Sequence, residues 1–301
     1  MNDVFLLELT LFILLAVGFF VKRIHLINAE GQRNLTDLVL YLVLPCNIVV
    51  SFLSGAGPEV LRECAALFAI SAGIQAFCVL YGRLLWRGGD EDRRISLRYA
   101  TICSNAGFLG NAIAEGYFGP IGLMYASVYL IPVRVMMWSE GLATFSGEKD
   151  LKAAAKKVLT HPCVVACILG CVLLATGAKL PQVILTPLST ISRCNTAMSM
   201  LVIGMILADI DPKTVFNPTV IWYTVNRLVI LPLIVYLVCL LLPVSHLIRN
   251  VAVLLTAMPA GATTSMLAAK YNRDPGFATT LVVFSTLCSL PAIMIWSAIL
   301  R

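Results

Sequence analysis

Charge is scarce in this chain, and long polar stretches are absent. Only 13% of the 301 residues are charged, whereas about a quarter is usual in soluble globular domains. Hydrophobic residues make up 59% of the chain, and the mean hydropathy is +0.89. This composition predicts an integral membrane protein whose partner is the lipid bilayer. The apolar runs leave no room for a soluble enzyme domain. The net charge is +6, but the chain has no soluble domain with a basic face, so we predict no binding of nucleic acid.

Histidines are also few, and most of the cysteines lie in apolar runs. The sequence has three histidines, all at the ends of apolar runs: His25, His161 and His246. No catalytic triad or histidine metal centre can be assembled from them, so we predict no enzyme activity, no catalytic residues, no metal site and no cofactor. Cys163, Cys167 and Cys171 recur at helical spacing. A packing face of small residues explains them better than a metal site, because metal sites need ligands from more than one element.

Ten apolar runs follow one another along the chain. A membrane-spanning helix needs roughly 20 apolar residues. Runs of this kind cover residues 4–21, 36–54, 64–82, 99–118, 121–145, 162–178, 186–208, 216–242, 250–269 and 276–300. We therefore predict an all-α integral membrane fold with ten transmembrane helices. The cores of the third, sixth, ninth and tenth runs contain no aspartate or glutamate, so the buried carboxylate relay of a proton pump is not apparent.

The basic residues indicate the orientation. With the N-terminus outside, fifteen Lys and Arg residues fall in cytoplasmic joints and four in outer joints. Because positive charge gathers on the cytoplasmic side of membrane proteins, we expect both termini outside. The sequence thus predicts a multi-pass protein of the cell (cytoplasmic) membrane.

The longest polar joint, residues 146–161, divides the spans into two sets of five. Because five is odd, related halves would be inserted in opposite orientations, which is the inverted-repeat plan of many secondary transporters. Three matches at one offset of 154 residues support this relation: Asn105-Ala106-Gly107 over Pro259-Ala260-Gly261, Tyr117 over Tyr271, and Leu53-Ser54 over Leu207-Ala208. We predict a first five-helix repeat over 1–145, a cytoplasmic linker over 146–161 and a second repeat over 162–301.

Two spans carry residues that weaken a helix near the middle of the bilayer. The fourth contains Asn105, Gly107 and Asn111, and the ninth contains Pro259 and Gly261. Glycine loosens the chain and proline removes a backbone donor, so both spans are predicted to be broken. Broken backbone at this depth needs protein or a water-filled cavity around it, which points to one central site. The alternative is that glycine and proline only let the helices pack closely.

A half-helix that starts at such a break offers free N–H groups and the positive end of its dipole to an anion. Asn105 could add a neutral amide donor, and Thr263 and Thr264 could add hydroxyls. Asn47 is an amide in an apolar run that could line the same cavity or join two helices. The predicted substrate-binding residues are Asn105, Gly107, Asn111, Pro259, Gly261, Thr263, Thr264 and Asn47.

Ionisable side chains inside spans are rare and usually functional. Arg134 and Arg227 lie in mid-span, where each could attract the anion as a charge partner or hold the scaffold by pairing with backbone carbonyls. The scaffold role is favoured, because a fixed charge in a site must also release its anion. Glu115 and Glu140 fall near the ends of spans, where we expect them to be solvated.

These residues resemble the auxin efflux carrier family of membrane transporters, in its compact bacterial form, over nearly the whole chain. The matching motifs are Met258-Pro259-Ala260-Gly261, Lys270-Tyr271-Asn272, Leu44-Pro45, Ser104-Asn105 and Arg227-Leu228 with Pro232. The resemblance implies inverted repeats whose fourth and ninth spans cross at their breaks, a plan related to the bile-acid symporters and Na+/H+ antiporters. It also implies that Asn105 contacts a substrate carboxylate. Spans one, two, six and seven would form a scaffold that can pair into a homodimer, and the others an elevator-type transport domain.

The chain departs from the plant members of that family. Ser104 stands where they have proline, the core of the third span lacks their acid, and their long cytoplasmic loop is reduced. We expect a secondary transporter of a small organic anion, such as malate, malonate or an auxin-like carboxylate, with Na+ and H+ both open as coupling ion. The alternatives are a sodium-coupled carrier or cation exchanger on the same plan, and a non-transporting membrane sensor.

Overall fold

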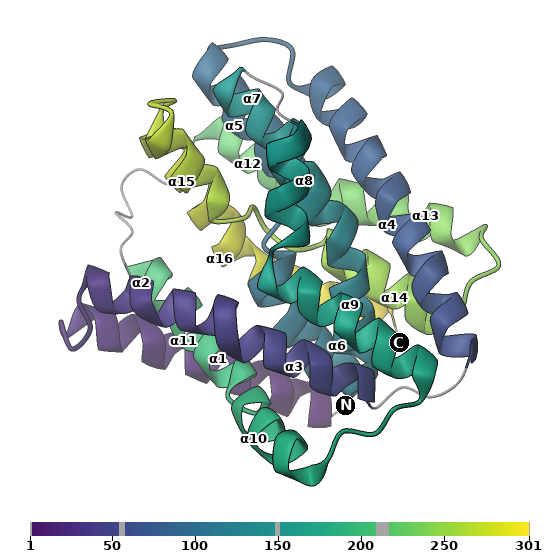
Figure 1. Cartoon of the computed structure of the whole chain (residues 1–301). Coiled ribbons are helices and arrows are strands. Elements are labelled where there is room, and N and C mark those ends of the chain that lie inside the picture. The colour runs from purple at the N-terminus through teal and green to yellow at the C-terminus, as the bar shows by residue number, and fades with distance from the viewer. Residues whose placement is uncertain (1, 54–57, 148–150, 209–216, 301) are drawn as a thin grey trace. The chain divides into compact units, whose positions relative to one another are not determined.

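The structure, a computed structural model, describes residues 2–53, 58–147, 151–208 and 217–300 (Figure 1). These residues are almost entirely helical, and the β-structure among them is one isolated antiparallel bridge between Ser104 and Ala260. The all-helical prediction is therefore confirmed for this part of the chain. Ser54 of the internal match, residues 148–150 of the predicted linker and residue 216 of the eighth predicted run lie outside the described residues. So do three of the basic residues counted for the orientation, Lys149, Lys213 and Arg301.

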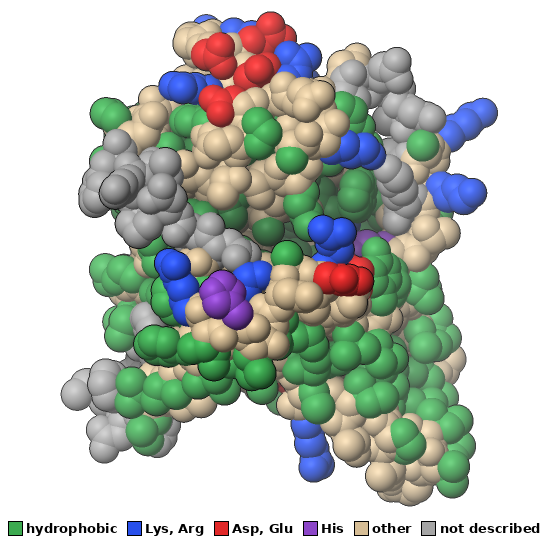
Figure 2. All heavy atoms as spheres, turned by 90° about the vertical axis from the view of Figure 1, so that its left-hand side faces the viewer, with side chains coloured by type: hydrophobic (Ala, Val, Ile, Leu, Met, Phe, Trp, Pro, Cys, Tyr) green, Lys and Arg blue, Asp and Glu red, His purple; other side chains and the backbone are tan. Residues whose placement is uncertain are grey.

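Six helical segments within the described ranges are long and apolar enough to cross a membrane. They are Ala29–Leu53, Glu59–Leu85, Ala106–Phe145, Gln182–Ala208, Pro218–Leu240 and Pro275–Ile299. Two shorter apolar helices, Pro162–Thr176 and His246–Thr256, coincide with further predicted runs. Hydrophobic side chains are exposed over much of the face drawn in Figure 2. These features are those of a multi-pass membrane protein, and the count of ten spans stays a prediction.

The chain forms two compact units, and each draws on both halves of the sequence. The first comprises Met1–Arg62, Asn111–Ser127 and His161–Ile210, and the second comprises Glu63–Gly110, Val128–Thr160 and Asp211–Arg301. The first unit contains the predicted spans one, two, six and seven, which the family resemblance assigns to the scaffold. Each unit contains parts of both predicted repeats. The repeats were defined by order along the sequence and not by packing, and they stay a prediction.

Helices of the first unit approach one another closely at glycines. The unit holds α1 (Asn2–Arg23), α2 (Ala29–Leu38), η1 (Val39–Val43), α3 (Leu44–Leu53), the first part of α6 (Asn111–Met136), α9 (Pro162–Thr176), α10 (Gln182–Ser192) and α11 (Asn195–Ala208). A β-carbon added to Gly204 of α11 would lie 2.0 Å from the carbonyl oxygen of Leu15 in α1. One added to Gly170 of α9 would lie 2.4 Å from the ring of Phe52 in α3. Small residues at such contacts are typical of packed membrane helices.

The second unit is built around buried aromatic residues. It holds most of α4 (Pro58–Leu85), α5 (Glu91–Ile102), η2 (Ala106–Gly110), the second part of α6, η3 (Met137–Gly141), α7 (Leu142–Ser146), α8 (Leu151–Leu159), α12 (Pro218–Val225), η5 (Asn226–Ile230), α13 (Leu231–Leu240), α14 (His246–Thr256), α15 (Thr263–Lys270) and α16 (Pro275–Ile299). The rings of Tyr99 and Phe145 meet edge to face with centroids 5.2 Å apart. Trp86 and Tyr223 belong to a second cluster that includes Ala260, so this core lies directly against the ninth predicted span.

Three local features differ from the sequence prediction. Helix α5 begins at Glu91 rather than at residue 99, because the Asp90 carboxylate accepts the Arg93 N–H and caps the helix. Helix α8 lies inside the predicted linker, where three consecutive alanines favour a helix. The fourth and fifth predicted spans join in α6, which is interrupted at Gly119 with φ of 68°, a conformation that glycine adopts easily.

Candidate functional site

Both predicted breaks are present in the second unit, and they pair with each other. Helix α5 gives way to η2 in the fourth predicted span, and α14 gives way to α15 in the ninth. The N–H of Asn105 donates to the carbonyl of Pro259 over 2.8 Å, and the N–H of Gly261 donates to the carbonyl of Cys103 over 3.0 Å. The two extended segments therefore cross as a short antiparallel pair. Because each segment supplies the other's hydrogen bonds, neither helix has to be continuous here.

Side chains donate hydrogen bonds to carbonyl groups at the C-terminal end of α5 and two residues beyond the end of α14. Arg227 donates from Nε to the Met258 carbonyl over 2.9 Å and from Nη1 to the Thr101 carbonyl over 3.0 Å. The Tyr223 hydroxyl donates to the Ala100 carbonyl over 2.8 Å. Helix C-termini carry negative partial charge, so one buried cation stabilises both ends. Arg227 thus bonds backbone carbonyls, as its predicted scaffold role requires, and its alternative role as a charge partner for an anion stays a prediction.

The two glycines of the predicted site differ in their surroundings. A β-carbon at Gly261 would lie 3.2 Å from the carbonyl oxygen of Cys103 and 3.3 Å from that of Ser104, so glycine permits the close approach of the two segments. At Gly107 no heavy atom of the described residues lies within 4 Å of the added carbon. Gly261 is therefore a packing position, and Gly107 faces open space.

Polar side chains near the crossing keep unused hydrogen-bonding capacity. Thr264 is fully buried, and its hydroxyl has no partner among the described residues. The Asn105 side chain is half-buried, and the same part of the chain offers its amide no hydrogen bond. Thr263 is half-buried at the start of α15. A buried polar group left unpaired costs about 1–3 kcal/mol, so a ligand or water at this place would complete the hydrogen bonding.

Asn111 and Arg134 are also buried without a full set of partners. In the first unit Asn111 is 0% exposed, and neither atom of its amide is hydrogen-bonded within the described ranges. In the second unit Arg134 is 6% exposed, and its Nη1 lacks a partner in those ranges. A desolvated guanidinium favours an anionic neighbour. Arg134 thus differs from Arg227, and its role as a charge partner for an anion stays a prediction.

Asn47 belongs to the first unit, where it bonds to other helices. Its Nδ2 donates to Oε2 of Glu115 over 2.9 Å, and its Oδ1 accepts from the Ser192 hydroxyl over 2.6 Å. Helix-to-helix bonding was one of its two predicted roles. Glu115 is half-buried in this contact rather than solvated. Sequence reasoning missed it because Asn47 and Ser192 are far from Glu115 along the chain and no local pattern marks their meeting.

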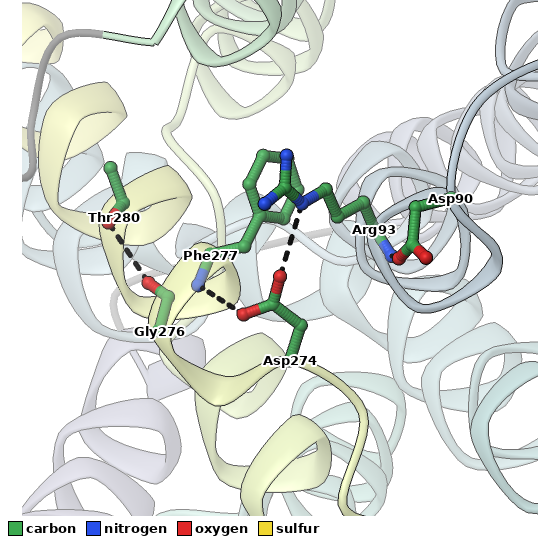
Figure 3. A network of polar contacts seen from close by, with 6 residues as sticks. All are labelled: Asp90, Arg93, Asp274, Gly276, Phe277 and Thr280. Atoms are coloured by element: carbon green, nitrogen blue, oxygen red, sulfur yellow. Dashed lines mark hydrogen bonds and ion pairs between the residues drawn. The ribbon is translucent and has the colours of Figure 1, made fainter.

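Two adjacent ion pairs join the start of α5 to the start of α16 in the second unit. Arg93 Nε lies 3.1 Å from Asp274 Oδ2, and Arg273 Nη1 lies 2.9 Å from Asp92 Oδ1. Figure 3 shows the Arg93 guanidinium over the ring of Phe277 and joined to Asp274; its central carbon lies 5.3 Å from the centroid of the ring. Asp274 also accepts the Phe277 N–H and so caps α16. The joints before span four and after span nine therefore meet, as expected if both lie on one side of the membrane.

A basic recess lies beside these joints in the second unit. The cavity measures about 370 Å³ and is lined by Val79, Arg83, Glu91, Arg94, Ile95, Arg98, Ile102, Glu140 and Thr144. Arg83 is paired with Glu140. Burial lowers the pKa of Arg98, and the charges of Arg94, Arg83 and Arg87 lower it further. Positive charges are therefore close together in this recess. None of its lining residues belongs to the crossed segments.

Comparison with known proteins places the chain among transporters. The model of a family described as "Membrane transport protein" matches residues 4–297. An uncharacterised transporter of Methanocaldococcus jannaschii is 25% identical over 97% of both chains. One from Methanothermobacter thermautotrophicus is 27% identical over 97% of both chains. The transporter YfdV of Escherichia coli is 21% identical over 97% of this chain and 96% of its own.

Proposed function

The chain belongs to the membrane transport protein family, which is the auxin efflux carrier family, and on that premise we propose that it is a secondary transporter of a small organic anion. The substrate would be a mono- or dicarboxylate such as malate, malonate or an auxin-like carboxylate. Membership favours transport over a membrane sensor, and it disfavours an enzyme. It leaves the substrate open, so the substrate class has to be argued from the site.

The crossing of the two extended segments carries the proposal. Two helical segments, η2 and α15, start there, and helix starts attract anions. The unpaired hydroxyl of Thr264 and the free amide of Asn105 lie in the same unit as these starts. A carboxylate would accept hydrogen bonds from such groups. Pro259 and Gly261 would serve by shaping the second break, and Thr263 by adding a hydroxyl.

The donors proposed for the substrate are neutral, and this matters for release. The guanidinium of Arg227 already bonds two backbone carbonyls, so it stabilises the crossing without holding the anion as a fixed ion pair. Neutral donors recognise a carboxylate at a moderate affinity, which a transporter needs on both sides of the membrane. Arg134 would supply a longer-range attraction.

Alternating access would follow from the division into two units. The first unit would be the scaffold, through which a homodimer would form, and the second would carry the crossing as the moving part of an elevator-type cycle. The matched breaks in spans four and nine support two inverted five-helix repeats, the plan that places such breaks at the binding site.

Transport currents test this proposal. Proteoliposomes on solid-supported membranes would be challenged with malate, malonate, lactate and indole-3-acetate, in sodium and in choline. We expect a saturable current for at least one anion, reduced about tenfold or more in Asn105→Ala, because the loss of a hydrogen bond to a charged group costs about 1.5–3 kcal/mol. Asn34→Ala, at an exposed position of α2, is the matched control.

Two results would contradict the proposal. One is an equal current in wild type and Asn105→Ala. The other is the absence of both current and counterflow of labelled malate or malonate, since counterflow also detects electroneutral exchange. A current that vanishes when choline replaces sodium would favour the sodium-coupled alternative.

A further inference from the structure

A single carboxylate in the first unit is surrounded by neutral hydrogen-bond donors. Oε2 of Glu115 accepts from Asn47 Nδ2 over 2.9 Å, from Asn195 Nδ2 over 3.4 Å and from the Thr196 hydroxyl over 3.4 Å. The donors belong to α3 and to the start of α11, whereas Glu115 belongs to α6. Within the described ranges no Lys, Arg or His lies within ion-pair distance of Glu115. Hydrogen bonds alone therefore balance its charge.

The two amides of this cluster are held in one orientation by a second layer of contacts. Asn47 Oδ1 accepts from the Ser192 hydroxyl over 2.6 Å, and Asn195 Oδ1 accepts from the Ser199 hydroxyl over 3.5 Å. All four of these side chains are buried. Their amide oxygens are thereby directed to serines, and their N–H groups to Glu115. The cluster presents hydrogens, not oxygens, to the carboxylate.

This arrangement discriminates between the two candidate coupling ions. A sodium ion would need several oxygen ligands around it, as hard cations do, but the amide oxygens of Asn47 and Asn195 are engaged elsewhere. A proton needs only one free oxygen. All three donors bond Oε2 of Glu115, and the described residues offer Oε1 no hydrogen bond. The geometry therefore favours a proton.

We propose that Glu115 is the proton-binding site of the transporter. The carboxylate takes a proton from a hydronium ion: one O–H bond of the ion breaks, an O–H bond forms at Oε1, a water molecule is released, and the carboxyl group changes from singly negative to neutral. The cluster leaves Oε1 as the one carboxylate oxygen to which the described residues donate no hydrogen bond. The assignment of the proton site stands on the cluster itself, and its role in coupling rests on the proposed transport function.

Few other groups near the cluster could cause a pH response. Arg193, in the turn between α10 and α11, is the one charged residue in α3, α10, α11 and that turn, and it is exposed. The other titratable groups on these elements and on the first part of α6 are cysteines and tyrosines: Cys46, Cys194, Tyr117 and Tyr125. A carboxyl signal from this part of the molecule would therefore belong to Glu115.

Infrared difference spectroscopy between low and high pH tests the proton site without any substrate. The reconstituted full chain should show the carbonyl stretch of a buried protonated carboxyl group. The band should be lost in Glu115→Gln and kept in Glu59→Gln, which makes the same change at an exposed position of α4. An unchanged spectrum in Glu115→Gln would overturn the assignment.

Flux under a proton gradient tests the coupling role separately. A gradient of one pH unit should drive accumulation of the transported anion up to about tenfold in wild type and Glu59→Gln. In Glu115→Gln the gradient should drive none, while counterflow of the anion continues. Accumulation driven by sodium and indifferent to pH would overturn the coupling role. If no anion moves in wild type the transport proposal fails, and the infrared result alone then decides whether Glu115 binds a proton.

Discussion

At the scale of single residues, Arg227 is the side chain on which the crossing most depends. In Arg227→Met the carbonyls of Met258 and Thr101 lose their donors in a buried place. We expect a loss of about 2 kcal/mol or more in the free energy of unfolding, since each unsatisfied buried group costs about 1–3 kcal/mol. Arg227→Lys keeps the charge but cannot bond both carbonyls in the same geometry, so its free energy of unfolding should lie between those of wild type and Arg227→Met. Thermal unfolding in detergent measures both, and a methionine variant as stable as wild type would refute the bracing role.

Substitutions of Gly261 and Gly107 compare a closely packed glycine with one that faces open space in the same site. Gly261→Ala brings a methyl group to about the contact limit of two backbone carbonyl oxygens, 3.2 and 3.3 Å away, so it should lower stability by about 1–3 kcal/mol. Gly107→Ala meets nothing within 4 Å among the described residues and should be neutral or slightly stabilising. Unfolding of the two variants side by side gives the comparison. Equal effects would show that the two segments do not approach as described.

Single residues differ in how far the sequence predicts them. The breaks were predictable because Asn105, Pro259 and Gly261 act on their own backbone, and such effects are local. The partners of Arg227 were not, since the carbonyls it binds are 31 and 126 residues away along the chain. The same reason hid Glu115, whose three donors are 68, 80 and 81 residues away. The substrate-binding roles of Asn105, Pro259 and Gly261 stay predictions.

At the scale of elements, the paired ion bridges between α5 and α16 give a prediction for salt dependence. A double-mutant cycle with Asp92→Asn and Arg273→Gln should show a favourable coupling at low salt that shrinks in high salt, because both side chains are about one-third exposed and water and ions screen the pair. The hydrogen bond to Asp92 raises the pKa of Arg273. Arg273 therefore stays charged at neutral pH. Its contribution to stability would be lost only as the pH rises through that raised pKa. Additive effects of the two substitutions at low salt would contradict the pairing.

Element boundaries were predicted least well, and the causes are local. An apolar run that marks a span ends at the first charged residues. Helix α5 nevertheless extends into the charged joint, because Asp90 caps it there. Helix α8 formed in a polar stretch because its residues favour a helix whether or not they are apolar. Hydropathy thus locates the apolar part of a helix and misses the polar turns that continue it.

At the scale of the whole molecule, the membrane class followed from composition, and the grouping of helices did not. Apolar runs fix which segments can cross a bilayer, but not which of them pack together. The close contacts of α1 with α11 at Gly18 and Gly204 depend on residues far apart in the chain. The first unit contains the four spans that the family resemblance assigns to a scaffold, together with residues 111–127 of α6, and the scaffold role of these helices stays a prediction.

Binding of a carboxylate at the crossed segments is tested most directly by the dissociation constant of the transported anion, measured by titration calorimetry in Asn105→Asp. This change keeps the size of the side chain and places a negative charge where the anion's carboxylate would lie. Asn34→Asp adds the same charge at an exposed position of α2. We expect Asn34→Asp to bind the anion like wild type and Asn105→Asp to bind it at least about tenfold more weakly, a loss of about 1.4 kcal/mol. Equal affinities in all three proteins would place the carboxylate elsewhere and contradict the claim.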